Sequence, residues 1–281
     1  MNARLLCALP TAVLAAAMAP CGARADAWHV GFATEAGSPS GYVQVRENRI
    51  DGTPLDLRGD LGVTRSNTVR IRATRGLGHR GQLHLWLSGT QLPGSATLRR
   101  TAYFNGATLA PGPVSSETGY TDYLRFQASY WYKLAGFGHG GRIWLSGGLT
   151  FVSLNFRMRA PVAAGSAGRE TKEDFNTQEL PVPLFGIHVT YPAGSGLTVF
   201  ADFTGGHLPW TNSLRREGGM VQVTQTNRDA DLGLRYRFAR TWTAGLYVFD
   251  RRYMQNERSA EDGNYVHIDR DGIGLEFADR F

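Results

Sequence analysis

Two short motifs near the C-terminal end of the chain carry side chains that could activate a water molecule. His267 and Asp269 lie two residues apart, and Asp229 and Asp231 lie at the same spacing. A histidine held by a carboxylate can take a proton from water and act as a general base. These four residues are therefore the candidate catalytic residues of a hydrolase.

Other chemically distinctive groups are sparse. The two cysteines, Cys7 and Cys21, both lie near the N-terminus in the segment interpreted below as a leader, so the mature chain has no cysteine nucleophile and no disulfide. His84 and His188 have no serine or carboxylate at the sequence spacing of a catalytic triad. No cluster of histidines and carboxylates suggests a metal site, and the glycine-rich segment 136–138 precedes an expected strand instead of a helix. We expect no metal and no cofactor.

The first 25 residues have the pattern of a secretory signal peptide. Arg4 supplies a positive charge, residues 5–19 are almost uninterrupted apolar residues, and Ala23 and Ala25 place small side chains two apart. A transmembrane helix would need about 20 apolar residues, and this run is shorter. The sequence predicts a signal peptide over residues 1–25 and a single domain over residues 26–281.

The composition favours β-structure in an exported chain. Glycine occurs 35 times and aromatic residues make up 11% of the chain, while the mean hydropathy of −0.27 is too low for a helical membrane protein. The net charge of +6 comes with an excess of arginine. An exported chain rarely meets nucleic acid, so we expect the arginines to contact outer-membrane lipid and lipopolysaccharide phosphates.

Alternation with a period of two residues recurs along the chain and predicts β-strands. The clearest case is 123–134, where apolar residues at even positions alternate with polar residues at odd positions, apart from Tyr123 and Trp131. Counting such segments gives about ten strands, with eight or twelve possible. The predicted strands are Gly41 to Glu47, Asn67 to Thr74, Gly81 to Thr90, Tyr120 to Leu134, Gly141 to Phe156, Pro183 to Tyr191, Gly196 to Gly205, Asp229 to Phe238, Thr241 to Tyr253 and Val266 to Phe281.

The connections between these segments separate a barrel from a soluble sandwich. Short links, such as residues 76–78 and 192–195, alternate with long polar stretches near 90–119, 157–179, 207–227 and 251–264. Tight periplasmic turns and long extracellular loops alternate in this way in outer-membrane barrels, whereas a sandwich has no reason to do so. The sequence therefore predicts an all-β, antiparallel transmembrane β-barrel.

Aromatic residues at the predicted turns and at the C-terminus support the barrel. Six of them flank the short turns, where barrels place an aromatic girdle. They are Tyr130, Tyr132, Tyr191, Tyr236, Phe238 and Trp242. The final segment, with Phe277 and a terminal Phe281, resembles the closing-strand signature that the barrel-assembly machinery of Gram-negative bacteria reads. Asp279 departs from that signature at a position that is usually apolar.

Inward-facing side chains fill much of a narrow barrel, so the polar strand faces should pack against one another. We expect a charge-paired lumen network. Its predicted members are Arg70, Arg72, Arg125, Arg142, Asp202, Asp231, Arg235, Arg237 and Glu276. The alternative is a small anion-selective, porin-like pore whose basic excess selects anions. Bulky Trp86, Trp131 and Trp144 at lumenal positions favour a closed lumen.

A hydrolase at the barrel rim is the second alternative, because ten-stranded outer-membrane proteases and lipid A-modifying barrels exist. The proteases resemble this chain in strand number and oppose an Asp-His pair to a pair of Asp residues at the extracellular rim. Here His267 and Asp269 share the parity of Ile273 and Leu275, which would point them outward unless a bulge intervenes. Ordinary ion pairing at the rim is the favoured interpretation of the four candidate residues.

Two segments taken together resemble a family of small Gram-negative outer-membrane barrels of unassigned function. They are Leu55 to Gly62, and Ala96 to Gly106 followed by Ser115 and the tyrosine-rich strand from Tyr120. The resemblance implies an outer-membrane barrel and no particular activity. We therefore expect a non-enzymatic integral barrel whose loops contact the envelope or an external partner. The candidate contact residues are Tyr103, Phe104, Leu208, Pro209 and Trp210.

Overall fold

The computed structural model describes residues 28–47, 49–163, 172–174, 180–213, 220–260 and 262–280. The predicted signal peptide, both cysteines and the terminal Phe281 lie outside the described residues. The leader, its cleavage and the role of Phe281 in assembly therefore stay predictions.

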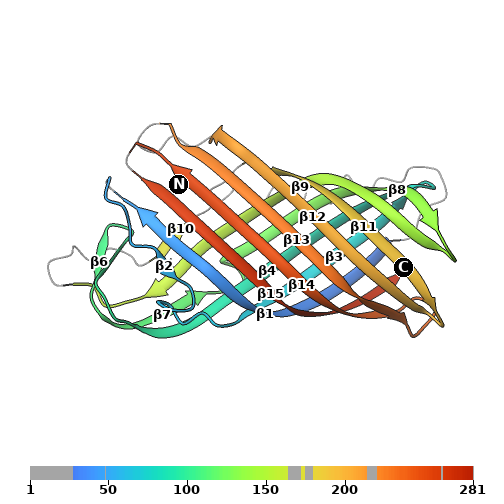
Figure 1. The fold of residues 1–281 in the computed structure, drawn as a ribbon, viewed down its shortest axis with the longest axis horizontal. Coiled ribbons are helices and arrows are strands. Elements are labelled where there is room, and N and C mark those ends of the chain that lie inside the picture. Colours follow the sequence, from blue (N-terminus) through green and yellow to red (C-terminus); the bar gives the residue numbers. More distant parts are fainter. Residues whose placement is uncertain are drawn as a thin grey trace.

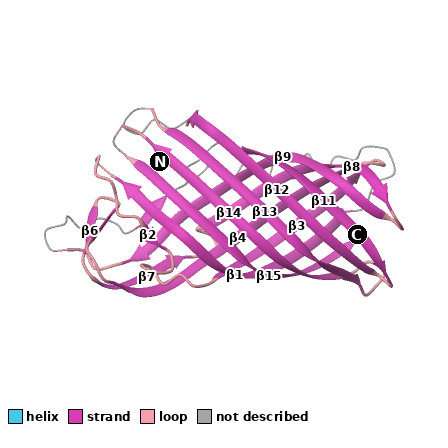
Figure 2. Cartoon of the chain, in the orientation of Figure 1, coloured by secondary structure: helices cyan, strands magenta, loops and turns pink. Residues whose placement is uncertain are grey.

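The described residues form fifteen strands and no helix (Figure 2). Among them there is accordingly no helix that could cross a bilayer. Ten strands are long and five are short. The long strands are β1 (Trp28–Arg46), β3 (Ser66–Leu77), β4 (Gly81–Leu98), β8 (Tyr123–Phe137), β9 (Gly141–Arg159), β11 (Val182–Gly194), β12 (Leu197–Asn212), β13 (Gln222–Arg237), β14 (Thr243–Arg258) and β15 (Gly263–Arg280). The short strands are β2 (Leu55–Asp56), β5 (Ala102–Phe104), β6 (Ala107–Leu109), β7 (Gly112–Thr118) and β10 (Lys172–Asp174).

The ten long strands pair in a continuous antiparallel ring (Figure 1). From β1 the ring passes through β3, β4, β8, β9, β11, β12, β13, β14 and β15, and β15 pairs with β1. The predicted antiparallel barrel is therefore confirmed. The strand count exceeds the expected ten because the five short strands lie in the long connections, mostly at one end of the molecule.

The first strand begins earlier than predicted. The prediction placed it at Gly41 to Glu47, whereas β1 starts at Trp28 and pairs with β15 from His29 onward. Its first half contributes Val30 and Phe32 to the outer surface, but small residues stand between and after them. Such a weak contrast between the two faces hides the period-two signal.

Several strands also run further than predicted at the end opposite the short turns. β12 continues to Asn212 and β13 already begins at Gln222. In the same way, β14 continues to Arg258 and β15 begins at Gly263. Most of the stretches 207–227 and 251–264, expected as loops, are therefore strand. Segment 90–119 likewise contains the end of β4, the β5–β6 hairpin and β7.

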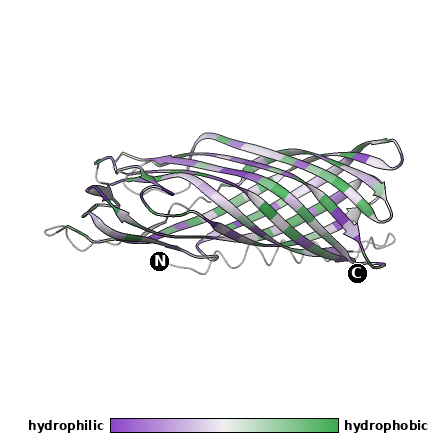
Figure 3. Cartoon of the chain, turned by 60° about the horizontal axis from the view of Figure 1, so that its bottom comes forward, coloured by the Kyte–Doolittle hydropathy of each residue, from purple (hydrophilic) through white to green (hydrophobic). Residues whose placement is uncertain are grey.

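A belt of exposed apolar side chains surrounds one half of the barrel. It includes Val30, Phe32, Ile71, Leu87, Leu145, Leu149, Phe151, Phe185, Ile187, Phe203, Leu232, Leu234, Leu246, Val248, Ile273, Leu275 and Phe277. Figure 3 shows this apolar surface between the middle of the barrel and the end that carries the C-terminus. The six predicted girdle aromatics are all exposed at that end. A surface of this kind is stable in lipid and costly in water.

The interior changes character along the barrel axis. At the level of the belt it is polar and charged, whereas the opposite, extracellular end contains a buried apolar cluster, here called the apolar cap. Barrel strands supply Val43, Val45, Leu92, Leu98, Tyr123, Val152, Leu154, Phe156, Met158, Tyr253, Val266 and Ile268 to it. The connecting segments supply Leu55, Leu57, Leu61, Val63, Ala102, Phe104, Ala107, Leu109 and Val114.

Segment 55–63 enters the cap through a compact turn. The Asp56 carboxylate accepts hydrogen bonds from the backbone N–H groups of Arg58 and Gly59 at 3.0 and 2.6 Å, which fixes the turn. The N–H of Leu57 donates to the carbonyl of Gly41 at 2.9 Å. This part of the extracellular end is therefore folded onto the barrel mouth.

Candidate functional site

Six charged side chains meet inside the barrel near the edge of the apolar belt that faces the extracellular end, and we call them the central network. They are Glu35, Arg70, Arg125, Asp229, Asp231 and Arg251. Three cations face three carboxylates. Arg251 is the hub, because its guanidinium lies 2.9 Å from Glu35, 2.6 Å from Asp231 and 3.6 Å from Asp229.

The remaining pairs of the central network join strands at different separations. Arg125 of β8 donates two hydrogen bonds to Asp229 of β13, at 2.9 and 2.7 Å. Two-point contacts of this type between a guanidinium and a carboxylate are strong and directional, and this one ties distant strands of the barrel together. Arg70 of β3 lies 2.6 Å from Glu35 of the neighbouring strand β1.

Neutral side chains complete the packing around the central network. The Trp86 ring lies 4.8 Å from the Arg70 guanidinium and 4.9 Å from that of Arg125. The Tyr247 hydroxyl lies 3.1 Å from Glu35. Tyr247 lies over the neighbouring strand β15 on the lumenal side, which requires glycine at position 274, because an added Cβ there would lie 2.2 Å from the tyrosine ring.

A second group lies nearer the short turns and is called the lower network. It consists of Arg72, Asp202, Arg235 and Glu276, which balance two cations against two carboxylates. Arg235 pairs with Glu276 and lies 3.9 Å from Asp202, and Arg72 lies 3.3 Å from Glu276. A cavity of about 10 Å³ borders Arg72 and Glu276, which is room for about one water.

Beside the lower network, His188 of β11 bonds to residues on both neighbouring strands. Its Nε2 lies 2.8 Å from the Ser146 hydroxyl and its Nδ1 lies 3.2 Å from Asp202. Its ring also stacks on Trp131 at 3.4 Å between centroids, and Trp131 stacks on His84 at 3.8 Å. The stack joins three rings from β11, β8 and β4, on one side of the lumen.

The order serine, histidine, carboxylate matches that of acyl-transfer triads, in which the histidine activates the serine. Sequence reasoning missed it, because Ser146, His188 and Asp202 lie far apart along the chain. Only the strand register brings them together, since His188 is paired with Asp202, and Gly186 with Ser146.

The four residues proposed from the sequence as a rim hydrolase do not form one site. Asp229 and Asp231 point into the lumen, where they belong to the central network. His267 and Asp269 share the outward parity of Ile273 and lie on the outer face, 3.1 Å apart. Asp269 also pairs there with Arg252 at 2.7 Å. The barrel wall therefore separates the two pairs.

Seven of the nine residues predicted for the lumen network occur in the two networks. Arg142 and Arg237 do not, and both are exposed at the end of the short turns. Sequence reasoning also missed Glu35 and Arg251. Glu35 lies in the half of β1 that was not predicted, whereas the parity that Arg251 shares with Tyr247 could have identified it.

Comparison with known proteins bears on the fold. No family model and no curated protein sequence matches the chain. Among solved structures, the outer membrane protease OmpT of Escherichia coli aligns with 90% of this chain and 97% of its own, at 11% identity and a TM-score of 0.51. This chain has the fold of an outer-membrane β-barrel.

Two further solved barrels align over most of this chain with lower TM-scores. The translocator domain of the autotransporter NalP from Neisseria meningitidis is 14% identical, with 98% of this chain and 95% of that chain covered and a TM-score of 0.35. The Pseudomonas putida toluene transporter TodX is 10% identical, with 94% and 91% covered and a TM-score of 0.32. The exposed apolar belt and the barrel fold together locate the chain in the outer membrane.

Proposed function

We propose that this outer-membrane barrel is closed to ions and serves as a platform that contacts envelope components or an external partner through its extracellular end. The observation that carries this proposal is the filling of the interior at successive levels. The lower network, the central network and the apolar cap follow one another along the axis. A chain built for permeation would keep a continuous aqueous path.

Charge balance argues against the alternative of an anion-selective pore. Five cations face five carboxylates in the two networks, so the charges of these ten residues balance. A further buried arginine, Arg270, donates its hydrogen bonds to the hydroxyls of Thr68 and Thr90. An anion filter needs cations whose charge is available to the permeating ion. Two of the lumenal arginines, Arg125 and Arg235, are instead bonded to Asp229 and Glu276.

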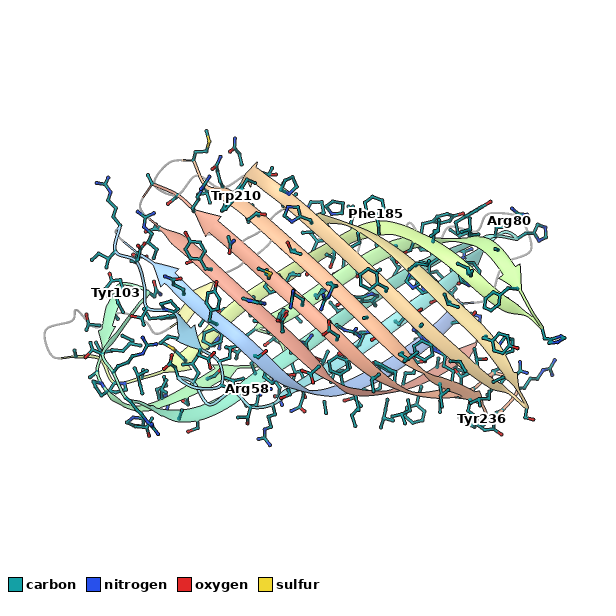
Figure 4. All side chains as sticks on the ribbon, viewed as in Figure 1. Arg58, Arg80, Tyr103, Phe185, Trp210 and Tyr236 are labelled. Atoms are coloured by element: carbon teal, nitrogen blue, oxygen red, sulfur yellow. The ribbon has the colours of Figure 1, made fainter. Side chains whose placement is uncertain are left out.

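Side chains on the extracellular end suggest where contact would occur. Trp210 is 44% exposed, and the Arg258 guanidinium lies 4.3 Å from its ring. Pro209 beside it is exposed. Phe104, predicted as a contact residue, is fully buried in the apolar cap, so that prediction is wrong. Figure 4 shows Trp210 and Tyr103 on the half of the molecule opposite Tyr236.

Conductance in planar bilayers tests the closed barrel. Purified protein, with insertion verified by heat-modifiable gel migration, should give no resolved steps. A porin reconstituted in the same bilayers serves as the positive control for conductance. Steps in the unmodified protein that shrink in Arg125→Gln or Arg235→Gln would establish the pore instead.

A second candidate function, acyl transfer in the lumen, rests on the bonds between Ser146, His188 and Asp202. The serine would attack an ester carbonyl while His188 accepts its proton and later returns it to the leaving alcohol. A fluorophosphonate probe tests this candidate directly. Labelling lost in Ser146→Ala and kept in Ser129→Ala, a buried lumenal serine on the next strand, would support it, and absence of labelling would reject it.

A further inference from the structure

Ion pairing differs in degree between the two ends of the barrel. At the extracellular end, several arginines have carboxylate partners, as in the pairs of Arg100 with Asp60 at 2.9 Å and Arg157 with Asp122 at 3.0 Å, whereas Arg58 donates to the Pro39 carbonyl and the Ser38 hydroxyl. At the periplasmic end, five cations form no ion pair among the described residues. They are Arg80, Lys133, Arg142, Arg237 and Arg240, here called the basic rim.

The composition of the periplasmic turns explains the difference. The four segments 74–82, 133–142, 192–196 and 237–243 contain the basic rim together with Arg75, His79 and His139, and no aspartate or glutamate. The cations of these turns therefore have no carboxylate within their own segments, although Asp279 of β15 lies at the same end of the barrel. Four of the five cations are exposed and Lys133 is half-buried, so their charge is available to a ligand from the periplasm.

The direction of the side chains argues against lipid head groups as the ligand. Lys133, Arg142 and Arg237 occupy lumen-facing positions, in line with Trp131, Trp144 and Arg235 on the same strands. They therefore surround the mouth and do not face the surrounding bilayer. Arg80 lies in a turn at the same end (Figure 4), where its guanidinium donates a hydrogen bond to the Tyr132 hydroxyl at 3.3 Å.

Bulky side chains occupy the lumen behind the basic rim. Trp131 is half-buried, and it stacks with His84 and His188 directly behind Lys133. The cations of the lower network beyond it are already bonded to Glu276. An anion attracted to the rim thus has a place to bind and no path to continue.

We propose that the basic rim is a binding site for an extended acidic peptide presented from the periplasm. A ten-stranded barrel has a narrow mouth, which suits one extended chain better than a folded domain. Guanidinium groups recognise carboxylates through paired hydrogen bonds. Each exposed contact is weak alone, so useful affinity needs a ligand with several carboxylates in a row. The site goes beyond the proposed extracellular platform and does not depend on it.

The experiment uses the full barrel in micelles of an uncharged detergent and a fluorescein-labelled oligoglutamate peptide, followed by fluorescence anisotropy. We expect binding that weakens as salt is raised. The triple variant Lys133→Gln, Arg142→Gln and Arg237→Gln should bind about tenfold more weakly, because three exposed charge contacts are lost. The matched control removes three cations from the other end, Arg100→Gln, Arg157→Gln and Arg159→Gln, and should bind like the unmodified protein.

Three outcomes would overturn the proposal. The first is no saturable binding of the peptide, and the second is equal loss in the rim variant and the control variant. The third is displacement of the peptide when the barrel is placed in nanodiscs of anionic phospholipid but not of zwitterionic lipid, which would make lipid head groups the ligand. Heat-modifiable migration of every variant verifies the fold.

Discussion

The same strands have opposite polarity patterns in the two halves of the molecule. In the half that carries the apolar belt, β15 points Ile273, Leu275 and Phe277 outward and Glu276 inward. In the extracellular half it points His267 and Asp269 outward and buries Val266 and Ile268. The same alternate positions of the strand face the lumen along its whole length. The medium outside the barrel changes from lipid to water.

The comparison teaches that two kinds of interior stabilise one barrel. The membrane half is stabilised by ion pairs that cross the lumen, and the extracellular half by an apolar core of the kind found in soluble proteins. A type of substitution that is tolerated in one half should therefore destabilise the other half, and the loss of stability should depend on the level of the position along the strand.

The largest effect is expected from Arg251→Met. The substitution leaves Glu35, Asp229 and Asp231 buried without their shared cation, and loss of one partner from a buried ionic group costs about 3–5 kcal/mol. Urea unfolding in lipid vesicles measures it. The neighbouring Arg252→Met removes an outward, partly exposed cation and should cost less than about 1 kcal/mol. Equal losses would show that the two faces of β14 are energetically alike.

A similar but local effect is expected from Phe104→Ala in the apolar cap. Removing a fully buried phenylalanine costs about 3–5 kcal/mol. Because segment 102–109 belongs to the cap and not to the ring, limited proteolysis at the extracellular end should accelerate while heat-modifiable migration persists. Tyr103→Ala, at a half-buried position of the same strand, is the control. Loss of the whole barrel would mean that the two halves unfold as one unit.

A cation placed on the outer face separates lipid from water along a single strand. Leu232 is 56% exposed within the apolar belt of β13, so Leu232→Arg should cost about 2–4 kcal/mol in a bilayer. Thr226 points to the same side above the belt, and Thr226→Arg should cost almost nothing. Unfolding of both variants in lipid vesicles measures the two losses of stability. A larger loss in Thr226→Arg than in Leu232→Arg would show that the apolar belt has been assigned to the wrong level.

The smallest effect concerns the outer ion pair of Asp269, which lies above the belt. Burial raises the pKa of Asp269, but the hydrogen bonds from Arg252 and the nearby His267 lower it more, so the pKa lies below its usual value. A carboxyl group whose pKa is lower in the folded state than in the unfolded state stabilises the protein at pH values above its unfolded-state pKa. This stabilisation is lost as the pH falls through the folded-state pKa. The difference in stability between the unmodified protein and Asp269→Asn should be small, about 0.5 kcal/mol near neutral pH. It should vanish in acid, and a difference that grows on acidification would contradict this sign.

The inverted pattern also explains how far the fold could be predicted from the sequence. Period-two alternation with apolar residues outward identified the ring wherever strands cross the belt, as in β8 and β13. Above the belt the apolar residues move to the inner face, so Val223 and Val266 continue their strands out of phase with the pattern below. The predictions therefore ended the strands too early, and the packed cap was mistaken for loops.

The candidate sites show the same limit. Inward parity along single strands was enough to select Arg125 and Arg235, because each lies opposite an apolar outer face. Partners depend on register between strands, which sequence alone did not supply. Hence the contact of Arg125 with Asp229, 104 residues away, and the bonds of His188 to its neighbours emerged only from the structure.

The pairing of β1 with β15 has a consequence for how the chain reaches its final state. The two strands are paired from His29 with Arg280 to Arg46 with Gly263, so partners in this seam are more than 200 residues apart in the sequence. Contacts of such long range form slowly, because loop closure is entropically costly. Every other neighbouring pair in the ring is closer in sequence and can form as a growing open sheet. Until the C-terminal segment arrives, that sheet has two unpaired edges that would otherwise recruit foreign strands. We therefore expect closure of the seam to be the slow step of folding, and we expect the two open edges to need protection from other chains until it occurs.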